Sequence, residues 1–97
     1  MDYGIASSDN RAPSYEKDPS DVIDLSTSWH HLGNDAILTS TWSSDGLTID
    51  SNLFSGLVTT VFVSGGTAGA INSLTNTIVT AVGRTLQRTL YIAVNEL

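Results

Sequence analysis

The sequence predicts an all-β fold, an antiparallel sandwich of about six or seven strands preceded by an extended N-terminal arm. Three observations support this prediction. From Val22 onward apolar and polar residues alternate, which is the spacing of a strand that buries one face. Turn signals rich in Gly and Asp separate these runs at intervals of about ten residues. Finally, 25 of the 26 Phe, Ile, Leu and Val residues lie between Val22 and Leu97.

The chain of 97 residues has room for one domain and divides into two segments. Residues 1–21 contain both prolines and few apolar side chains, so we expect an extended or flexible arm there and a sandwich domain over residues 22–97. Two interpretations of the arm stay open: a weakly ordered terminus, or a strap that lies on a neighbouring subunit. In the second, the candidate contact residues are Tyr3, Ile5 and Tyr15.

Three strands are predicted in the first half of the sandwich domain. The run "VIDLSTSW" forms the first and places Leu25 and Trp29 on one face. After the loop "HHLGND", the run "AILTSTW" forms the second, with Leu38 and Trp42 on a common face. "SSDG" is a turn signal, because Asp-Gly allows the positive φ of a tight reversal. "LTID" then forms a short third strand with Leu47 inward, and "SNLFSG" connects it to the next.

Three further strands follow in the runs "LVTTVFVS", "AINSLTNTIVTA" and "GRTLQRTLYIAV". A helix over the middle run is rejected because its Thr, Asn and Ser residues weaken helix propensity. The candidate core residues are Trp29, Trp42, Val61, Val63, Leu90 and Ile92. An exposed tryptophan pair that stacks on sugar rings is the alternative for Trp29 and Trp42. Arg88 shares the core face of the last strand, so it either lies at the rim, which we favour, or pairs with an inward carboxylate.

The segment "VFVSGGTAGA" raises the question of a phosphate-binding loop. Such a loop lies between a strand and the N-terminus of a helix, and a P-loop also needs a Lys directly after its last glycine. Here no helix is predicted to follow, and no Lys is present in the segment. Gly65, Gly66 and Gly69 are therefore predicted to form a structural turn between two strands.

No catalytic residue, cofactor site or metal site is predicted. His30, His31 and Asp35 share one loop, but adjacent histidines on an extended chain point in opposite directions, and a closed zinc site needs four convergent ligands. The chain has no cysteine and no other histidine. We therefore interpret His30 and His31 as solvent-facing, with a subunit contact weakened by protonation near about pH 6 as their one wider role.

Composition narrows the partners. A net charge of −6 argues against nucleic acid, because neutralising phosphates needs clustered Lys and Arg. We expect no secretion signal and no membrane span, and the absence of cysteine fits a reducing cytoplasm. From Val22 onward only seven of 76 residues are charged, and strand edges with so few charges invite pairing with another chain. We therefore expect subunit contacts and a homo-oligomeric ring.

Several motifs resemble the phage fiber-tail adaptor family. These are a Trp-bearing first strand, the second Trp in "TSTW", then "GLTI", "TTVFVSGGTAG" and "GRTLQRTLYIAV", over about residues 18–94. At Asn72 this chain differs from the aromatic residue expected in the family. The resemblance implies an immunoglobulin-like sandwich and a structural virion protein that joins connector or portal, tail and fiber components, assembled in the host bacterial cytoplasm. The alternative function is a module that binds glycans or a host surface.

Overall fold

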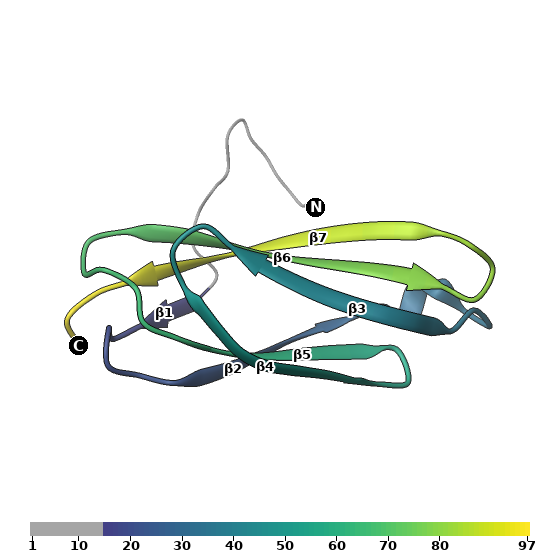
Figure 1. The fold of residues 1–97 in the computed structure, drawn as a ribbon, viewed down its shortest axis with the longest axis horizontal. Coiled ribbons are helices and arrows are strands. Elements are labelled where there is room, and N and C mark those ends of the chain that lie inside the picture. The colour runs from purple at the N-terminus through teal and green to yellow at the C-terminus, as the bar shows by residue number, and fades with distance from the viewer. Residues whose placement is uncertain (1–14) are drawn as a thin grey trace.

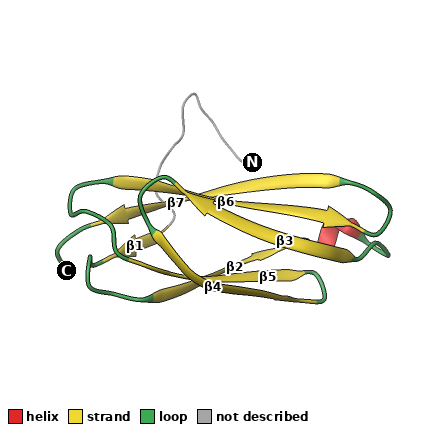
Figure 2. Ribbon diagram, viewed as in Figure 1, coloured by secondary structure: helices red, strands yellow, loops and turns green. Residues whose placement is uncertain are grey.

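The computed structural model describes residues 15–97, which form two β-sheets packed face to face (Figure 1). Figure 2 shows that almost all regular structure in this part of the chain is strand, with one short helix. The elements are β1 (Tyr15–Lys17), β2 (Ile23–Ser28), the 3-10 helix η1 (His30–Leu32), β3 (Ile37–Ser44), β4 (Thr48–Ser55), β5 (Val58–Ser64), β6 (Ile71–Thr80) and β7 (Thr85–Val94). The predicted all-β sandwich is confirmed, and its immunoglobulin-like class stays a prediction.

One sheet has the strand order β1-β7-β6-β3 and the other has the order β2-β5-β4. Every strand pair is antiparallel except β1 and β7, which run parallel. β1 places Tyr15 beside Ile92, with the tyrosine ring partly exposed. This strand lies within the residues 1–21 that the sequence analysis sets apart as an arm, and Tyr3 and Ile5 lie outside the described residues.

β3 contains a bulge that reverses one prediction. Ile37 pairs with Thr80 and Thr39 pairs with Val79, so Leu38 is the extra residue between them. The prediction that Leu38 faces inward with Trp42 is wrong: Leu38 is 59% exposed, and Ile37 is buried in its place. An extra residue shifts the alternation by one position, which a strict period-two pattern does not include.

β4 is longer than predicted. The prediction that the third strand ends at Asp50 and that "SNLFSG" is a connection is wrong, because the strand continues to Ser55. A second bulge, between Ile49 and Ser51, shifts the register with β5 by one residue. The adjacent apolar residues Leu53 and Phe54 concealed this strand, because they fall on opposite faces and both remain exposed.

The core consists of two apolar clusters. The first is built from Leu25, Leu47, Val61, Val63, Leu74, Ile92 and Val94, and the second from Trp29, Leu32, Ile37 and Ile78. Of the candidate core residues, Val61, Val63 and Ile92 are fully buried and Trp29 is 1% exposed. Trp42 and Leu90 are partly buried against the first cluster. Burying such side chains is the main favourable contribution to folding.

A chain of buried polar groups joins the two sheets between these clusters. The Trp29 indole Nε1 donates to Thr59 Oγ1 at 3.3 Å and to Asn76 Oδ1 at 3.2 Å, and the Thr59 hydroxyl donates to the same Asn76 oxygen at 2.6 Å. Asn76 Nδ2 in turn donates to Ser40 Oγ at 2.9 Å and to the Thr41 carbonyl at 3.0 Å. Through this one asparagine, β5 and the residue after β2 are connected to β6 and β3. We call the network the inter-sheet polar bridge, and its members are Trp29, Thr59, Asn76, Ser40 and Thr41.

The glycine segment is the corner between β5 and β6. Gly65, Gly66 and Gly69 all have positive φ, at 79°, 98° and 91°. A Cβ at Gly66 would lie 2.8 Å from Val94 Cγ2 and 3.0 Å from Leu47 Cδ2, so the close approach excludes a side chain there. The buried Lys17 ammonium donates to the Gly65 carbonyl at 2.6 Å and to the Asp18 carbonyl at 2.8 Å, which ties β1 to this corner.

Candidate interaction surface

The antiparallel strands gather the loops of the sandwich at two opposite ends (Figure 2). One end carries η1, the β4–β5 turn and the β6–β7 turn; the other carries the β1–β2 turn, the β3–β4 turn and the glycine corner. The first, which we call the cationic end, contains Arg84, Arg88, His30 and His31. The second, which we call the acidic end, contains or borders Glu16, Asp18, Asp21, Asp24, Asp45, Asp50 and Glu96.

Arg88 lies at the rim of the sandwich, on the open side between β7 and β2. Its guanidinium carbon lies 4.6 Å from the centre of the Trp29 ring, and its Nη1 donates to the Ser28 carbonyl at 3.1 Å. Within the described residues these contacts, rather than an inward carboxylate, hold the side chain in place. Arginine over an indole face is a favourable arrangement in which the cation keeps its outward edge hydrated.

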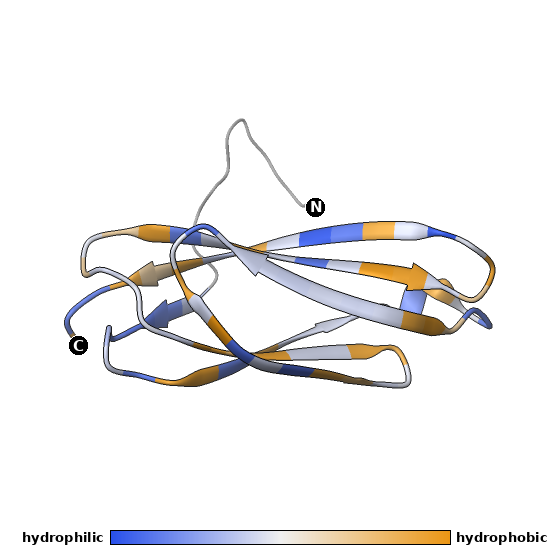
Figure 3. Cartoon of the chain, viewed as in Figure 1, coloured by the Kyte–Doolittle hydropathy of each residue, from blue (hydrophilic) through white to orange (hydrophobic). Residues whose placement is uncertain are grey.

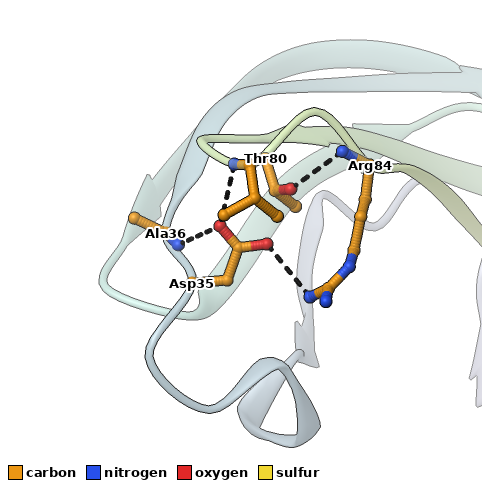
Figure 4. Close-up of polar contacts among 5 residues, drawn as sticks. Asp35, Ala36, Thr80 and Arg84 are labelled. Carbon is orange, nitrogen blue, oxygen red and sulfur yellow. Dashed lines mark hydrogen bonds and ion pairs between the residues drawn. The ribbon is translucent and has the colours of Figure 1, made fainter.

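Asp35 and Arg84 fasten the β6–β7 turn to the loop before β3 (Figure 4). Asp35 Oδ1 accepts the Ala36 amide at 2.8 Å and the Val82 amide at 3.2 Å, while Oδ2 accepts Arg84 Nη1 at 3.3 Å. The Asp35 side chain is only 3% exposed. Burial raises the pKa of this carboxyl, but hydrogen bonds from Thr80 and the two amides outweigh it, and the net pKa lies below the usual 3.8.

The acidic end carries two carboxylates that accept backbone hydrogen bonds. Asp18 accepts the Ser20 hydroxyl at 2.6 Å and the amides of Ser20 and Leu97 at 2.9 Å each. The Ser20 hydroxyl, followed by these amides, lowers the pKa of Asp18 to about 2. Asp45 accepts the Ser73 amide at 2.8 Å, and this bond contributes most to keeping the Asp45 pKa below its usual value. Both groups therefore stay charged in mildly acidic solution.

Asn72, at the start of β6, packs beside Asp45 in the β3–β4 turn. Its Nδ2 donates to Asp45 Oδ1 at 3.3 Å, and the side chain is packed so closely over Gly46 that any Cβ at that position would collide with it. The asparagine thus holds the β3–β4 turn against the start of β6 by a polar contact.

The open strand edges carry few charges. β3 and β4 are edges of their sheets, and Asp50 is the single charged residue in the two strands. Figure 3 shows β3 pale along most of its length, where serine and threonine fill its positions. On β4, Leu53 is 53% and Phe54 39% exposed. Unpaired edges of this kind favour pairing with another chain.

The residues weighed for chemistry do not converge. His30 and His31 are both exposed on η1, where the Ser28 hydroxyl bonds His30 Nδ1 and the His31 ring lies 5.9 Å from the Trp29 ring. Among residues 15–97 no three His, Cys, Asp or Glu side chains are grouped to hold a metal ion. Burial of Trp29 removes one of the two rings of the proposed sugar-stacking pair. No helix within the described chain is long and apolar enough to cross a membrane.

Sequence reasoning missed two of the groups that shape this surface. Lys17 reads as one of few charges in a polar segment, yet its ammonium is buried. Asn76 lies on the buried face of β6 with Leu74 and Ile78, but its role as partner of the Trp29 indole depends on a contact between residues 47 positions apart in the chain. That Asn76 faces Thr59 and Trp29 across the core becomes visible only when the two sheets are packed together.

Comparison with known families gives one result that covers most of the chain. The family model described as Podophage GP4 fiber-tail adaptor protein gp77 matches residues 17–93. The match includes every strand except the first two residues of β1 and the last residue of β7. A comparison with curated proteins finds no match.

Proposed function

Because the chain belongs to the Podophage GP4 fiber-tail adaptor protein gp77 family, we propose that several copies of it join the connector or tail of the virion to the fibers. The family is a class of structural phage adaptors and not a class of enzymes. The name of the family supports the assignment of this chain to the virion. We propose in addition that the chain is assembled in the host cytoplasm and that its copies form a closed ring.

The observation that carries this proposal is the pair of open edges, β3 and β4. Each strand has eight residues, and the backbone groups on their outer sides have no strand beside them within the described residues. A free monomer usually protects such edges with Lys, Pro or bulges. This chain has a bulge in each strand but one charge between them, so the edges are suited to burial against neighbouring subunits.

The mechanism is geometric. The inter-sheet polar bridge and the two apolar clusters make a rigid body whose edges and ends face different directions. Individual contacts through such surfaces are weak, but several copies held together convert later binding events into intramolecular ones and raise the overall affinity. The arm of residues 1–21, with Tyr3, Ile5 and the exposed Tyr15 as candidate anchors, is proposed as an additional contact to a neighbouring copy.

Size-exclusion chromatography with light scattering tests the multi-copy arrangement. The full chain is compared with a chain that begins at Ser14, which retains β1 and the buried Lys17. Each is run alone and mixed with the connector and fiber proteins of the same phage. We expect a defined oligomer or a complex for the full chain. A protein that stays monomeric and binds neither partner contradicts the proposal.

A variant in β4 tests whether the edge takes part. Leu53→Lys places a cation on an exposed position that faces away from the core, opposite Thr60 on β5. Lysine on an edge strand disfavours strand addition, so we expect weaker assembly with unchanged thermal stability. Thr75→Lys, on the outer face of the central strand β6, is the matched control because it adds the same charge away from an edge.

A further inference from the structure

The two ends of the described chain differ in charge. Asp35 is the one carboxylate at the cationic end, and its oxygens are occupied by two amides and by Arg84. Among residues 15–97, Lys17 is the one cation at the acidic end, and its ammonium is buried against carbonyls. The exposed surface of the cationic end therefore presents Arg88 and two imidazoles, while the acidic end presents carboxylates, Asp24 and Glu96 among its exposed ones.

Arg88 is held ready to bind an anion. The guanidinium has five N–H donors, and the Ser28 carbonyl accepts from one nitrogen, Nη1, while the Trp29 ring supports one face of the plane. The side chain is exposed, so its outward donors face solvent. A planar fork matches a carboxylate in bidentate fashion, and restraint before binding reduces the rotamer entropy lost on contact.

These complementary surfaces cannot meet within one molecule. Arg88 contacts the Ser28 carbonyl at one end of β2, and Asp24 lies four residues away along the same strand, about 13 Å at the rise of a strand. The turns at the two ends are further apart, because β6 and β7 contain ten residues each. A carboxylate that pairs with Arg88 therefore has to come from a second molecule, and a second copy of this chain carries an acidic end. Contact between opposite ends is heterologous, and a heterologous contact closes into a ring when the rotation between copies allows it.

We propose that the cationic end binds the acidic end of a second copy of this chain, with the Arg88 guanidinium donating hydrogen bonds to a carboxylate of the neighbour. This inference rests on the multi-copy arrangement of the proposed function and specifies its contact. Attraction of this kind is screened over about 8–10 Å at physiological ionic strength. Self-association therefore weakens as salt is raised.

The first test is sedimentation of the full chain at about 50 mM and 500 mM salt. Arg88→Gln removes one positive charge, and Thr89→Glu is the matched control because it changes the net charge equally at the next residue, on the opposite face of β7. We expect Arg88→Gln to raise the self-association Kd about tenfold or more and to reduce its salt dependence. Thr89→Glu should associate like the unaltered chain.

The second test is charge reversal. Arg88→Glu and Asp24→Lys should each weaken self-association, and the two combined in one chain should recover part of it. Circular dichroism and tryptophan fluorescence verify that each variant is folded, since Arg88 contacts Trp29.

The outcomes separate this contact from the proposed function. Oligomers that persist unchanged in Arg88→Gln overturn the end-to-end contact and leave the adaptor role intact. A chain that is monomeric at both salt concentrations overturns the contact too, and its failure to bind connector or fiber then also contradicts the adaptor role. A third outcome is that the chain is monomeric and binds a connector or fiber protein only when Arg88 is present. The partner of the cationic end is then that virion protein and not a second copy of this chain.

Discussion

Asn76→Leu is the most informative perturbation of the fold, because it removes the inter-sheet polar bridge while keeping the branched shape and the number of heavy atoms of the side chain. Asn76 is fully buried and makes contacts with Trp29, Thr59, Ser40 and Thr41. In the variant the Thr41 carbonyl loses its asparagine donor, and the Trp29 N–H keeps only the longer bond to Thr59 Oγ1 at 3.3 Å. Two poorly satisfied groups at about 1–2 kcal/mol each give a loss of about 2–4 kcal/mol.

Urea unfolding followed by tryptophan fluorescence measures this loss, with a decrease in Tm of about 10–25 °C as a second readout for a domain of this size. Thr75→Ala is the control, since the Thr75 hydroxyl bonds Thr89 on the exposed outer face and its removal should cost about 0.5 kcal/mol or less. The cycle with Trp29→Phe is decisive, because Phe has no N–H to leave unpaired. Asn76→Leu should cost about 1 kcal/mol less in that background. A loss below about 0.5 kcal/mol in the original chain refutes the bridge.

Three further predictions concern the glycine corner, the acidic end and β1. Gly66→Ala should lower the free energy of unfolding, measured by urea unfolding, by about 2 kcal/mol, because the new Cβ would lie 2.8 Å from Val94 Cγ2. Gly69→Ala should lower it by about half as much, because no atom lies within 4 Å of a Cβ there. The pKa of Asp18 is lowered from 3.8 to about 2, so the contribution of this carboxylate to stability is complete above pH 3.8 and is lost as pH falls toward 2. In Asp18→Asn the free energy of unfolding should therefore depend less on pH in that window. The same pH dependence in the variant and the original chain contradicts the assignment. Lys17→Met should expose residues 15–17 to faster amide exchange if the ammonium secures β1 to Gly65, and unchanged exchange contradicts that role.

The sequence predicts the inner faces of most strands, and physical reasons explain where it does not. Alternation identifies β2, β5 and β6, because each buries one face without interruption. It also identifies β7, although the exposed Arg88 interrupts the inner face of that strand. It fails at Leu38 and beyond Asp50, where bulges add one residue to a strand and shift the pattern. A bulge depends on the partner strand, which local sequence does not specify.

The candidate surface was harder to predict than the fold. The rim position of Arg88 follows from a cation on an inward face near the start of the last strand. Its contact with Trp29 does not follow, because that contact joins residues 59 positions apart across the open side of the sandwich. The buried state of Lys17 depends on the parallel pairing of β1 with β7, for which three residues carry too short a pattern.

Trp29 connects the stability of the fold to the cationic end. Its N–H lies in the inter-sheet polar bridge, while the face of its ring supports Arg88. The position of the guanidinium is therefore determined by the same indole that the core holds at 1% exposure. A substitution of Trp29 alone alters folding and association together, so it does not separate its effect on one from its effect on the other. Arg88 can be changed while the inter-sheet polar bridge stays intact, and Asn76 can be changed while the guanidinium stays intact. The Arg88 variant therefore reports on association, and the Asn76 variant reports on stability.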